Sequence, residues 1–420
     1  MKKLGLCLFL AACPVWAWAA TPDTAGDDPA AGAEARLDEL QRQYRRLQER
    51  TERELRALEA RIDTLQADDR EAARGDASGG LRDLPIEVSG DLRLRYEHTT
   101  DHAGDPDRNR GSLRGRLGAA YRLNERVTIG GRLVTGNSDD PNSADVTLSD
   151  FTDDFEVSLD RAYAEYRGER GFVVGGKFAN PLANTDLVWD GDVNPAGLAG
   201  GYTLYRNGGF SAAATGVFAV IDEQTAGRDS DMLGGQLSLS LAPAPDWSLA
   251  LHGGYYDYSI GSLANADAGD IRGNRLAPGG TEYLSAFELL DILGELRYSG
   301  WSAEWPISLT ADYVKNLGAE VSGDTGYAVY LGTGRLAHSG DLRFQYGYSE
   351  AGTDAVFAAY SQDNITYSTN YRLHTLKLTY VPFAQGRTNL TVYRYRRDDP
   401  AAGQDRDDVT RIRLSQSFLF

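Results

Sequence analysis

Residues 86–97 read IEVSGDLRLRYE, and the side chains of this stretch alternate between two kinds. The even-numbered positions, from Ile86 to Tyr96, are apolar residues or glycine, whereas the odd-numbered positions, from Glu87 to Glu97, are charged residues or serine. A period of two places successive side chains on opposite faces of a β-strand. The stretch therefore predicts a strand with one apolar face and one charged face.

The same alternation recurs along the chain, for example in 110–122, 230–241 and 338–350, and gives sixteen predicted strands between residues 86 and 420. Short connections, including the hairpin signal Asn207-Gly208, alternate with long ones. This layout is typical of an outer-membrane barrel, in which closure removes the unpaired edges that lipid would not tolerate. We predict an all-β fold, a 16-stranded antiparallel transmembrane β-barrel, with 14 or 18 strands as alternatives.

The N-terminus has the features of an export signal. Lys2 and Lys3 precede an apolar run, and Ala17-Trp18-Ala19 offers a cleavage site, so residues 1–19 are predicted to be a signal peptide. Cys13 lies in a lipobox-like context, and its lipidation is the alternative. Cleavage after Ala19 removes both cysteines and changes the formal charge of the chain from -18 to -20. The acidic balance argues against a nucleic-acid partner, which would require clustered positive charge.

Residues 20–33 read as a flexible segment, and residues 34–68 lack both Gly and Pro, which favours one long helix. Its apolar positions are spaced by three and four residues, as in a coiled coil interrupted by one stutter. The predicted oligomerisation seam consists of Leu37, Leu40, Tyr44, Leu47, Leu55, Leu58, Ile62 and Leu65. A periplasmic coiled coil that sets the oligomeric state is expected, and a single amphipathic helix is the alternative. Residues 69–85 are a linker.

The last residues alternate again and end at Phe420. This ending resembles the C-terminal aromatic signature of outer-membrane barrels, which implies handling by the barrel assembly machinery. The first third of the predicted barrel resembles the proteobacterial "putative porin" family in four stretches. They are GDLRLRYEHTTDHAGDPDRNRGSLRGRLG from Gly90, RLVTGNSDDPNSADVTLSDF from Arg132, LDRAYAEY from Leu159, and VGGKFANPL leading to DLVWDGDVNPAGLA from Asp186. The resemblance implies an outer-membrane channel with a periplasmic coiled coil and does not specify a solute.

Seven arginines lie on the charged faces of the first three predicted strands and the last one. These arginines, which we call the arginine wall, are Arg93, Arg95, Arg114, Arg116, Arg132, Arg411 and Arg413. The four strands are neighbours in a closed barrel, and an arginine facing lipid costs about 2–4 kcal/mol at the membrane midplane. The arginine wall is therefore predicted to line the lumen. A lattice of arginine–carboxylate pairs that braces the barrel is the alternative role.

The long connection 179–198 contains no Lys or Arg and carries Asp186, Asp190 and Asp192. In general diffusion porins the corresponding loop folds inward, and the resemblance implies the same here. An acidic loop opposite the arginine wall would produce a transverse field across the pore. The stretch from Asp190 resembles the start of a calcium loop but lacks its later glycine and glutamate, so no metal is predicted.

We therefore expect a porin for passive diffusion of small hydrophilic solutes and ions, weakly cation-preferring because the predicted outer loops are acidic. The alternative is a substrate-selective channel or exporter for anionic sugars or organic acids. The sequence contains no HExxH metal-ligand spacing, no G-x-S-x-G motif and no phosphate-binding loop, so an enzyme and a cofactor are not expected. Expected partners are outer-membrane lipid and lipopolysaccharide, and two further copies of the chain in a homotrimer. The expected location is the outer membrane of a Gram-negative bacterium.

Overall fold

The computed structural model describes residues 85–100, 107–138, 143–148, 151, 154–400 and 408–420. The predicted signal peptide, flexible segment and coiled coil with its seam lie outside these residues, as does the linker except Pro85. A compact unit runs from Pro85 to Phe420. Within the described part of the chain, no helix is long and apolar enough to cross a membrane.

Seventeen strands and one short helix are present in the described residues. In chain order they are β1 (Ile86–Thr99), β2 (Arg108–Arg122), β3 (Val127–Thr135), β4 (Val146–Thr147), β5 (Val157–Arg167), β6 (Gly171–Lys177), β7 (Ala196–Asn207), β8 (Phe210–Asp222), β9 (Ser230–Leu241), β10 (Trp247–Ser259), α2 (Ala268–Ile271), β11 (Phe287–Tyr298), β12 (Ile307–Asn316), β13 (Thr325–Gly334), β14 (Leu342–Ala351), β15 (Tyr371–Tyr380), β16 (Gly386–Arg397) and β17 (Val409–Leu419).

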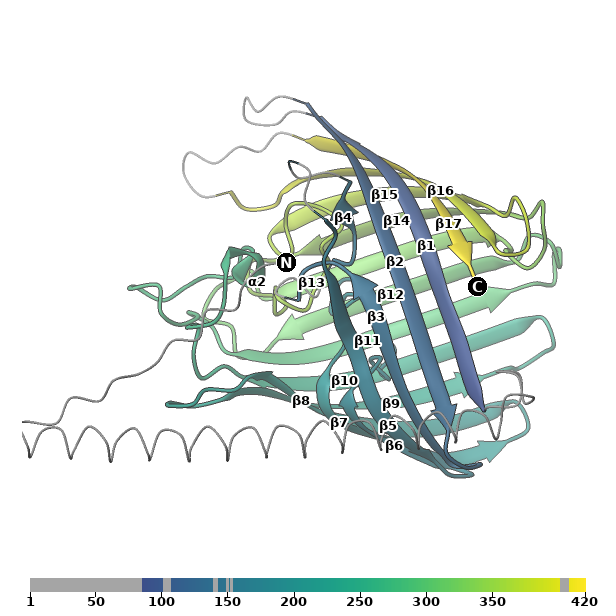
Figure 1. The fold of residues 1–420 in the computed structure, drawn as a ribbon, viewed down its shortest axis with the longest axis horizontal. Helices are drawn as coiled ribbons and strands as arrows, with labels where there is room; N and C mark the ends of the chain where they lie inside the picture. Colours follow the sequence, from purple (N-terminus) through teal and green to yellow (C-terminus); the bar gives the residue numbers. More distant parts are fainter. Residues whose placement is uncertain (1–84, 101–106, 139–142, 149–150, 152–153, 401–407) are drawn as a thin grey trace, which may run out of the picture. The chain divides into compact units, whose positions relative to one another are not determined.

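The strands form one closed antiparallel barrel (Figure 1). Strand β1 pairs with β2 on one side and with the last strand, β17, on the other. The closing register places Leu92 opposite Phe418, and Phe420 continues the pairing through a hydrogen bond from the Gly90 amide to its carbonyl oxygen at 2.8 Å. Closure leaves no free strand edge, as a membrane-spanning sheet requires.

Strand β4 is only two residues long and shares a barrel position with β3. It pairs with β2 at Leu113 and Ser112, above the segment where β2 pairs with β3. The wall thus has sixteen strand positions, and the predicted 16-stranded antiparallel barrel is confirmed.

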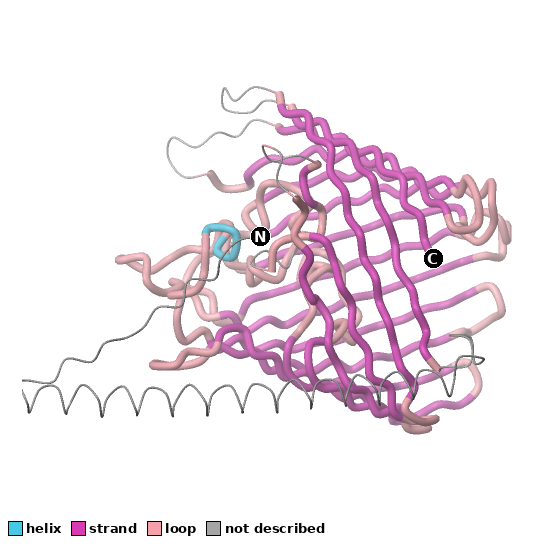
Figure 2. The backbone as a smooth tube through the Cα atoms, viewed as in Figure 1, coloured by secondary structure: helices cyan, strands magenta, loops and turns pink. Residues whose placement is uncertain are grey.

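The two ends of the barrel differ in the length of their connections. Seven short turns, such as Gly208-Gly209 between β7 and β8, lie at the end that also holds Phe420, which we call the turn end. The long connections, including the one with α2, lie at the opposite end, which we call the loop end (Figures 1 and 2). Trp301 lies in the short connection between β11 and β12 at the turn end, and 78% of its surface is exposed.

Outward-facing and inward-facing side chains alternate along each strand. On β7, Leu198 points outward and is 55% exposed, whereas its neighbour Ala199 points inward and is 1% exposed. Outward positions across the barrel are mostly Leu, Val, Ile, Phe and Tyr, which form an apolar outer face. The apolar core lies inside the barrel, where two loops pack against inward-facing side chains of β6 to β17.

Candidate functional site

One of these two loops is the predicted acidic connection, which spans residues 178–195 between β6 and β7 and is called the acidic loop below. A tight turn begins at Thr185, whose carbonyl oxygen accepts hydrogen bonds from the Val188 and Trp189 amides, both at 3.1 Å. The apolar side chains of this turn point into the barrel interior, and Trp189 is 1% exposed. Its indole Nε1 donates to the Val193 carbonyl at 2.9 Å, which closes the loop on itself.

The second loop comprises residues 352–370 between β14 and β15 and is called the distal loop. Asp354, with no exposed surface, anchors it by accepting hydrogen bonds from the Ser285 hydroxyl at 2.6 Å and the Arg275 amide at 2.9 Å. Asn274 supports it further by donating to the carbonyl oxygens of Thr353 and Val356, both at 3.0 Å. The distal loop is therefore held rigidly inside the barrel.

The acidic loop and the distal loop pack directly against each other. The Trp189 and Tyr360 rings lie 4.5 Å apart, and the Asp190 amide donates to the Tyr360 carbonyl at 2.7 Å. Asn364 of the distal loop donates from Nδ2 to Asp186 Oδ2 at 3.1 Å. Side chains of both loops therefore form one surface across the lumen.

Opposite this surface lies the arginine wall, on inward-facing positions of β1, β2, β3 and β17. Arg413 reaches the distal loop, because its Nη1 donates to Asn364 Oδ1 at 2.8 Å. Arg411 also reaches the distal loop, because its Nη1 donates to the Asn364 carbonyl oxygen at 2.8 Å. Asn364 thus joins the arginine wall to Asp186 of the acidic loop.

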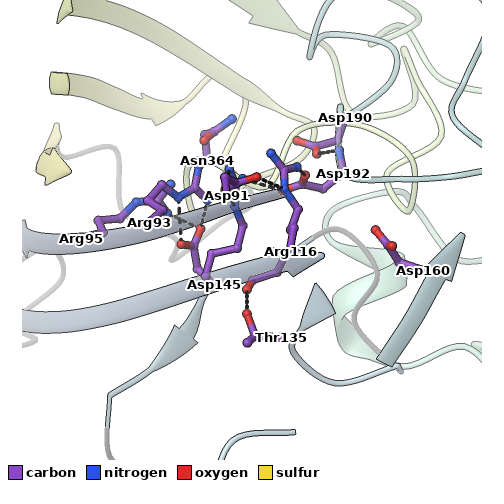
Figure 3. Close-up of polar contacts among 12 residues, drawn as sticks. Asp91, Arg93, Arg95, Arg116, Thr135, Asp145, Asp160, Asp190, Asp192 and Asn364 are labelled. Atoms are coloured by element: carbon purple, nitrogen blue, oxygen red, sulfur yellow. Dashed lines mark hydrogen bonds and ion pairs between the residues drawn. The ribbon is translucent and has the colours of Figure 1, made fainter. Parts of the chain in front are cut away.

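Among the described residues outside the acidic loop, three carboxylates are each shared by at least two arginines. Asp145, which precedes β4, contacts Arg93 and Arg95, the latter at 2.7 Å (Figure 3). Asp91 of β1 accepts from Arg114 at 2.7 Å and from Arg116 at 2.6 Å. The third is Glu97, whose arginine contacts are Arg110 at 2.9 Å, Arg411 at 3.8 Å and Arg413 at 2.6 Å.

Each shared carboxylate can neutralise only one of the arginines that contact it, so net positive charge remains on the arginines. Seven arginines contact these three carboxylates, and two of the seven, Arg114 and Arg116, also contact Asp192 of the acidic loop, so the arginines exceed the four carboxylates by three charges. Such pairing braces the strands and also keeps this side of the lumen positive. Both roles considered from the sequence are therefore compatible with the geometry.

The arginine wall and the acidic loop meet at Asp192. Its carboxylate lies 3.3 Å from Arg116 Nη1 (Figure 3). Arg114 Nη1 lies 3.9 Å from the same carboxylate. Arg132 is placed apart from the others, because it contacts Asp160 of β5, with Nε at 3.0 Å from Oδ1. Asp160 also accepts from Asn194 Nδ2 at 3.3 Å, which ties Arg132 to the base of the acidic loop.

Two cavities lie between the arginine wall and the two loops. The larger, about 1000 Å³, opens toward the loop end and is lined by Arg95, Asp145, Asp363 and Arg411, among others. The smaller, about 250 Å³, which we call the constriction cavity, is bounded by Arg93 and Arg95 on one side. Its other lining residues are Asp145, Asp186, Asp190, Gly191, Asp192, Asp363 and Asn364.

Burial and neighbouring charges shift the acidity of the loop carboxyls. Burial, reinforced by Asp186 and Asp363, raises the pKa of Asp190 to about 9, so this side chain is neutral at pH 7. Burial also raises the pKa of Asp363, to about 6, although Arg413 opposes the shift. Burial alone would raise the pKa of Asp145 too, but Arg95 and Arg93 hold it below its usual value. Among the described residues, no group of three or more His, Cys, Asp or Glu side chains is arranged to hold a metal ion.

The distal loop was not predicted from the sequence, and neither were Asp145 and Asn364 as contacts of the arginine wall. One signal was present, since the apolar run Val356-Phe357-Ala358-Ala359-Tyr360 lies within a long connection. A solvent-exposed loop rarely carries such a run, and here Val356, Phe357 and Ala358 are buried while Ala359 and Tyr360 are half-buried. Asp145 offered no comparable signal, because the surrounding segment reads only as a polar loop.

Residues 85–268, somewhat less than half of the chain, match a family described as "Putative porin", which confirms the resemblance found in the sequence. Among solved structures, Pseudomonas putida OprB at high pH aligns with a TM-score of 0.55 and 13% identity, over 83% of this chain and 97% of that one. An anion-selective porin from Comamonas acidovorans aligns with a TM-score of 0.50 and 14% identity, over 80% and 99%. These likenesses show the fold. Comparison with curated proteins gives no match.

Proposed function

We propose that the protein is an outer-membrane porin of a Gram-negative bacterium, through which ions and small hydrophilic solutes diffuse passively. The observation that carries this proposal is the continuity of the two cavities, which share Arg95, Asp145 and Asp363 as lining residues. A polar route therefore leads from the loop end to the constriction cavity along β1. The family match and the barrel fold favour a channel over an enzyme.

The narrowest part of this route is proposed to lie between Arg93 and Arg95 on one side and the acidic loop on the other. Positive and negative side chains face each other there, so the field is directed across the pore rather than along it. Such a field favours polar solutes, because an apolar solute would displace water that the charged groups hold. This arrangement suits a general diffusion channel that excludes apolar molecules.

The ionic preference is proposed to be weak and in favour of cations. At the constriction Asp192 and Asp363 offset part of the arginine excess, whereas burial raises the pKa of Asp190 to about 9 and also raises the pKa of Asp186. The long connections at the loop end then decide whether cations or anions are preferred. These connections are rich in Asp, as in 222–231. A negative entrance raises the local concentration of cations.

One observation favours the alternative, a channel selective for anionic sugars or organic acids. The excess of three arginine charges over Arg110 and the arginine-wall residues of β1, β2 and β17 would attract an anion along these strands. The Comamonas acidovorans porin, which has the same fold, is described as anion-selective.

Planar-bilayer recording of the purified protein tests the proposal. We expect conductance proportional to salt concentration, and a reversal potential in a KCl gradient that indicates a modest preference for K⁺. Absence of conductance would refute the channel. Clear anion selectivity together with saturable block by an organic acid or sugar acid would favour the alternative.

The assembly is also proposed from the sequence. Residues 34–68 would form a periplasmic coiled coil that holds three barrels together, with the turn end facing the periplasm. The segment ending at Phe420 would be recognised by the barrel assembly machinery. Carboxylates at the loop end would contact lipopolysaccharide phosphates through divalent cations.

A further inference from the structure

A third cavity, which we call the side pocket, lies between strands β6 to β10 and the two inward-folded loops. Its volume is about 200 Å³, which corresponds to about seven water molecules at ~30 Å³ each. The acidic loop contributes Val193 and Asn194 to its lining, and the distal loop contributes Tyr360. Among the described residues, none that lines the side pocket also lines the larger cavity or the constriction cavity. The side pocket is therefore separate from the proposed ion route.

One wall of the side pocket is aromatic. The ring centroids of Tyr283 and Phe357 lie 5.8 Å apart, and those of Phe357 and Tyr360 lie 5.4 Å apart. Ile221 and Ile260 extend this wall with aliphatic side chains. A flat ring of a ligand can pack against such a surface, because aromatic rings favour tilted and offset contacts with one another.

One end of the side pocket carries a positive charge without a partner. Lys177, the last residue of β6, is half-buried and lines the side pocket. Within the part of the chain that the structure describes, its ammonium group has no hydrogen-bond or ion-pair partner, and the one carboxylate whose charge acts on it is Asp160. Asp160 is itself bound by Arg132 at 3.0 Å. An anionic ligand would thus restore to Lys177 an interaction that partial burial removes.

The other end of the side pocket is negative. Asp222, at the end of β8, is separated from Lys177 by strand β7. Two strand spacings of ~4.8 Å place the backbones of these two residues at least about 10 Å apart. Asp222 accepts a hydrogen bond from Asn265 at 2.8 Å, and Asp270 lines the same end of the side pocket. These two carboxylates would repel a second negative charge on a ligand whose first carboxylate is bound to Lys177.

We propose that the side pocket binds small aromatic monocarboxylic acids, whose ring packs on Tyr283 and Tyr360 while the carboxylate pairs with Lys177. A pocket with an apolar wall and one well-placed polar group is the common form of a small-molecule site. This inference goes beyond the proposed porin function, because an acid bound in the side pocket lies outside the ion route.

Four probes separate the contributions of charge and ring. Benzoate is the expected ligand, and benzamide has nearly the same shape without the charge. Acetate keeps the carboxylate without the ring, and terephthalate adds a second carboxylate that would face Asp222 and Asp270. Affinities are measured at pH 7 by ligand-observed NMR titration of the purified full-length protein in detergent. We expect saturable binding of benzoate, at least about tenfold tighter than binding of the other three, because a hydrogen bond to a charged group contributes about that much.

Two variants assign the site. Lys177→Gln should weaken benzoate binding at least about tenfold and leave the weaker binding of benzamide unchanged. Ala266→Trp should abolish the binding of both, because Ala266 lines the side pocket and a large side chain there would fill it. Lys315→Gln is a matched control, since Lys315 pairs with Asp324 at 3.0 Å on β12 and does not line the side pocket. Heat-modifiable migration on a denaturing gel checks that each variant is folded.

Three results would overturn the inference. They are equal affinities for benzoate and benzamide, benzoate binding that is unchanged in folded Lys177→Gln protein, and the absence of saturable benzoate binding. None of these results would affect the porin proposal, which depends on conductance. Conversely, a protein that binds benzoate as expected but conducts no ions would retain the side pocket and refute the channel.

Discussion

Replacing Asp145 by Asn provides a direct test of the electrostatics at the constriction. Asp145 is the one carboxylate shared by Arg93 and Arg95, and the side chain of Asp145 is 8% exposed. Its pKa lies below the usual value, so it is ionised throughout the neutral range. The substitution keeps the shape of the side chain and removes one negative charge from the pore. We expect the permeability of cations to fall and that of anions to rise.

The size of the effect follows from the cavity dimensions. A volume of about 250 Å³ equals a sphere of about 4 Å radius, so an ion at its centre lies about 6 Å from the carboxylate. In water one unit charge at that distance contributes about 0.7 kcal/mol, which screening at 0.1 M salt reduces to about 0.4 kcal/mol. The contribution has opposite sign for cation and anion, so the difference is about 0.8 kcal/mol. The cation-to-anion permeability ratio should therefore fall about three- to fourfold.

The assay is the reversal potential of single channels in a KCl gradient, with correct folding checked by heat-modifiable migration on a denaturing gel. Asp160→Asn is the matched control, because Asp160 also pairs with a lumen arginine, Arg132, but lines neither cavity. Its permeability ratio should change much less. An Asp145→Asn channel with an unchanged ratio, or with increased cation preference, would show that the ion path does not pass beside Arg93 and Arg95.

Three further predictions address acidity, loop packing and assembly. Asp363, with a pKa raised to about 6, gains its negative charge as the pH rises. Cation preference should therefore increase between about pH 5 and pH 7 in reversal-potential measurements, and a flat profile would contradict this role; Asp363→Asn should remove the increase. Trp189→Ala removes a side chain that is 1% exposed and packs on Tyr360, so we expect a loss of about 3–5 kcal/mol of loop packing, seen as noisier and larger single-channel currents. Currents identical to those of the unmodified channel would refute the inward packing of the acidic loop. Deletion of residues 34–68 should lower the oligomer size on a native gel, and an unchanged size would remove the role assigned to the coiled coil.

Much of the barrel wall could be predicted because strand formation is a local property. The alternation in 230–241 predicted the strand that forms as β9 (Ser230–Leu241), since a lipid-facing strand must carry an apolar residue at every second position. Boundaries were less certain where turn residues also alternate. The predicted strand 338–350 forms as β14, which begins only at Leu342, because Asp341 caps the preceding turn by accepting from the His338 amide at 2.7 Å.

The lumen was harder to predict because its contacts join residues far apart in the sequence. The composition of 179–198 was enough to single out Asp186, Asp190 and Asp192. Their neighbour Asn364, however, is brought to them by a second loop from the far side of the barrel. No local period marks such a contact, and the apolar run at Val356 was the one available signal.

The residue pattern along the chain was enough to predict the strands and the charged residues that avoid the outer face, and it favoured sixteen strands while leaving 14 or 18 open. These features follow from the chemistry of the solvent, because lipid on one side of each strand and water on the other impose a period of two. Which of these charges meet, in contrast, depends on the three-dimensional fold. Closing the barrel places Glu97 of β1 beside Arg413 of β17, and folding two loops inward sets Asp186 across from Arg93. Charge pairing depends on distances of a few ångströms between remote segments, which the order of residues along the chain does not specify.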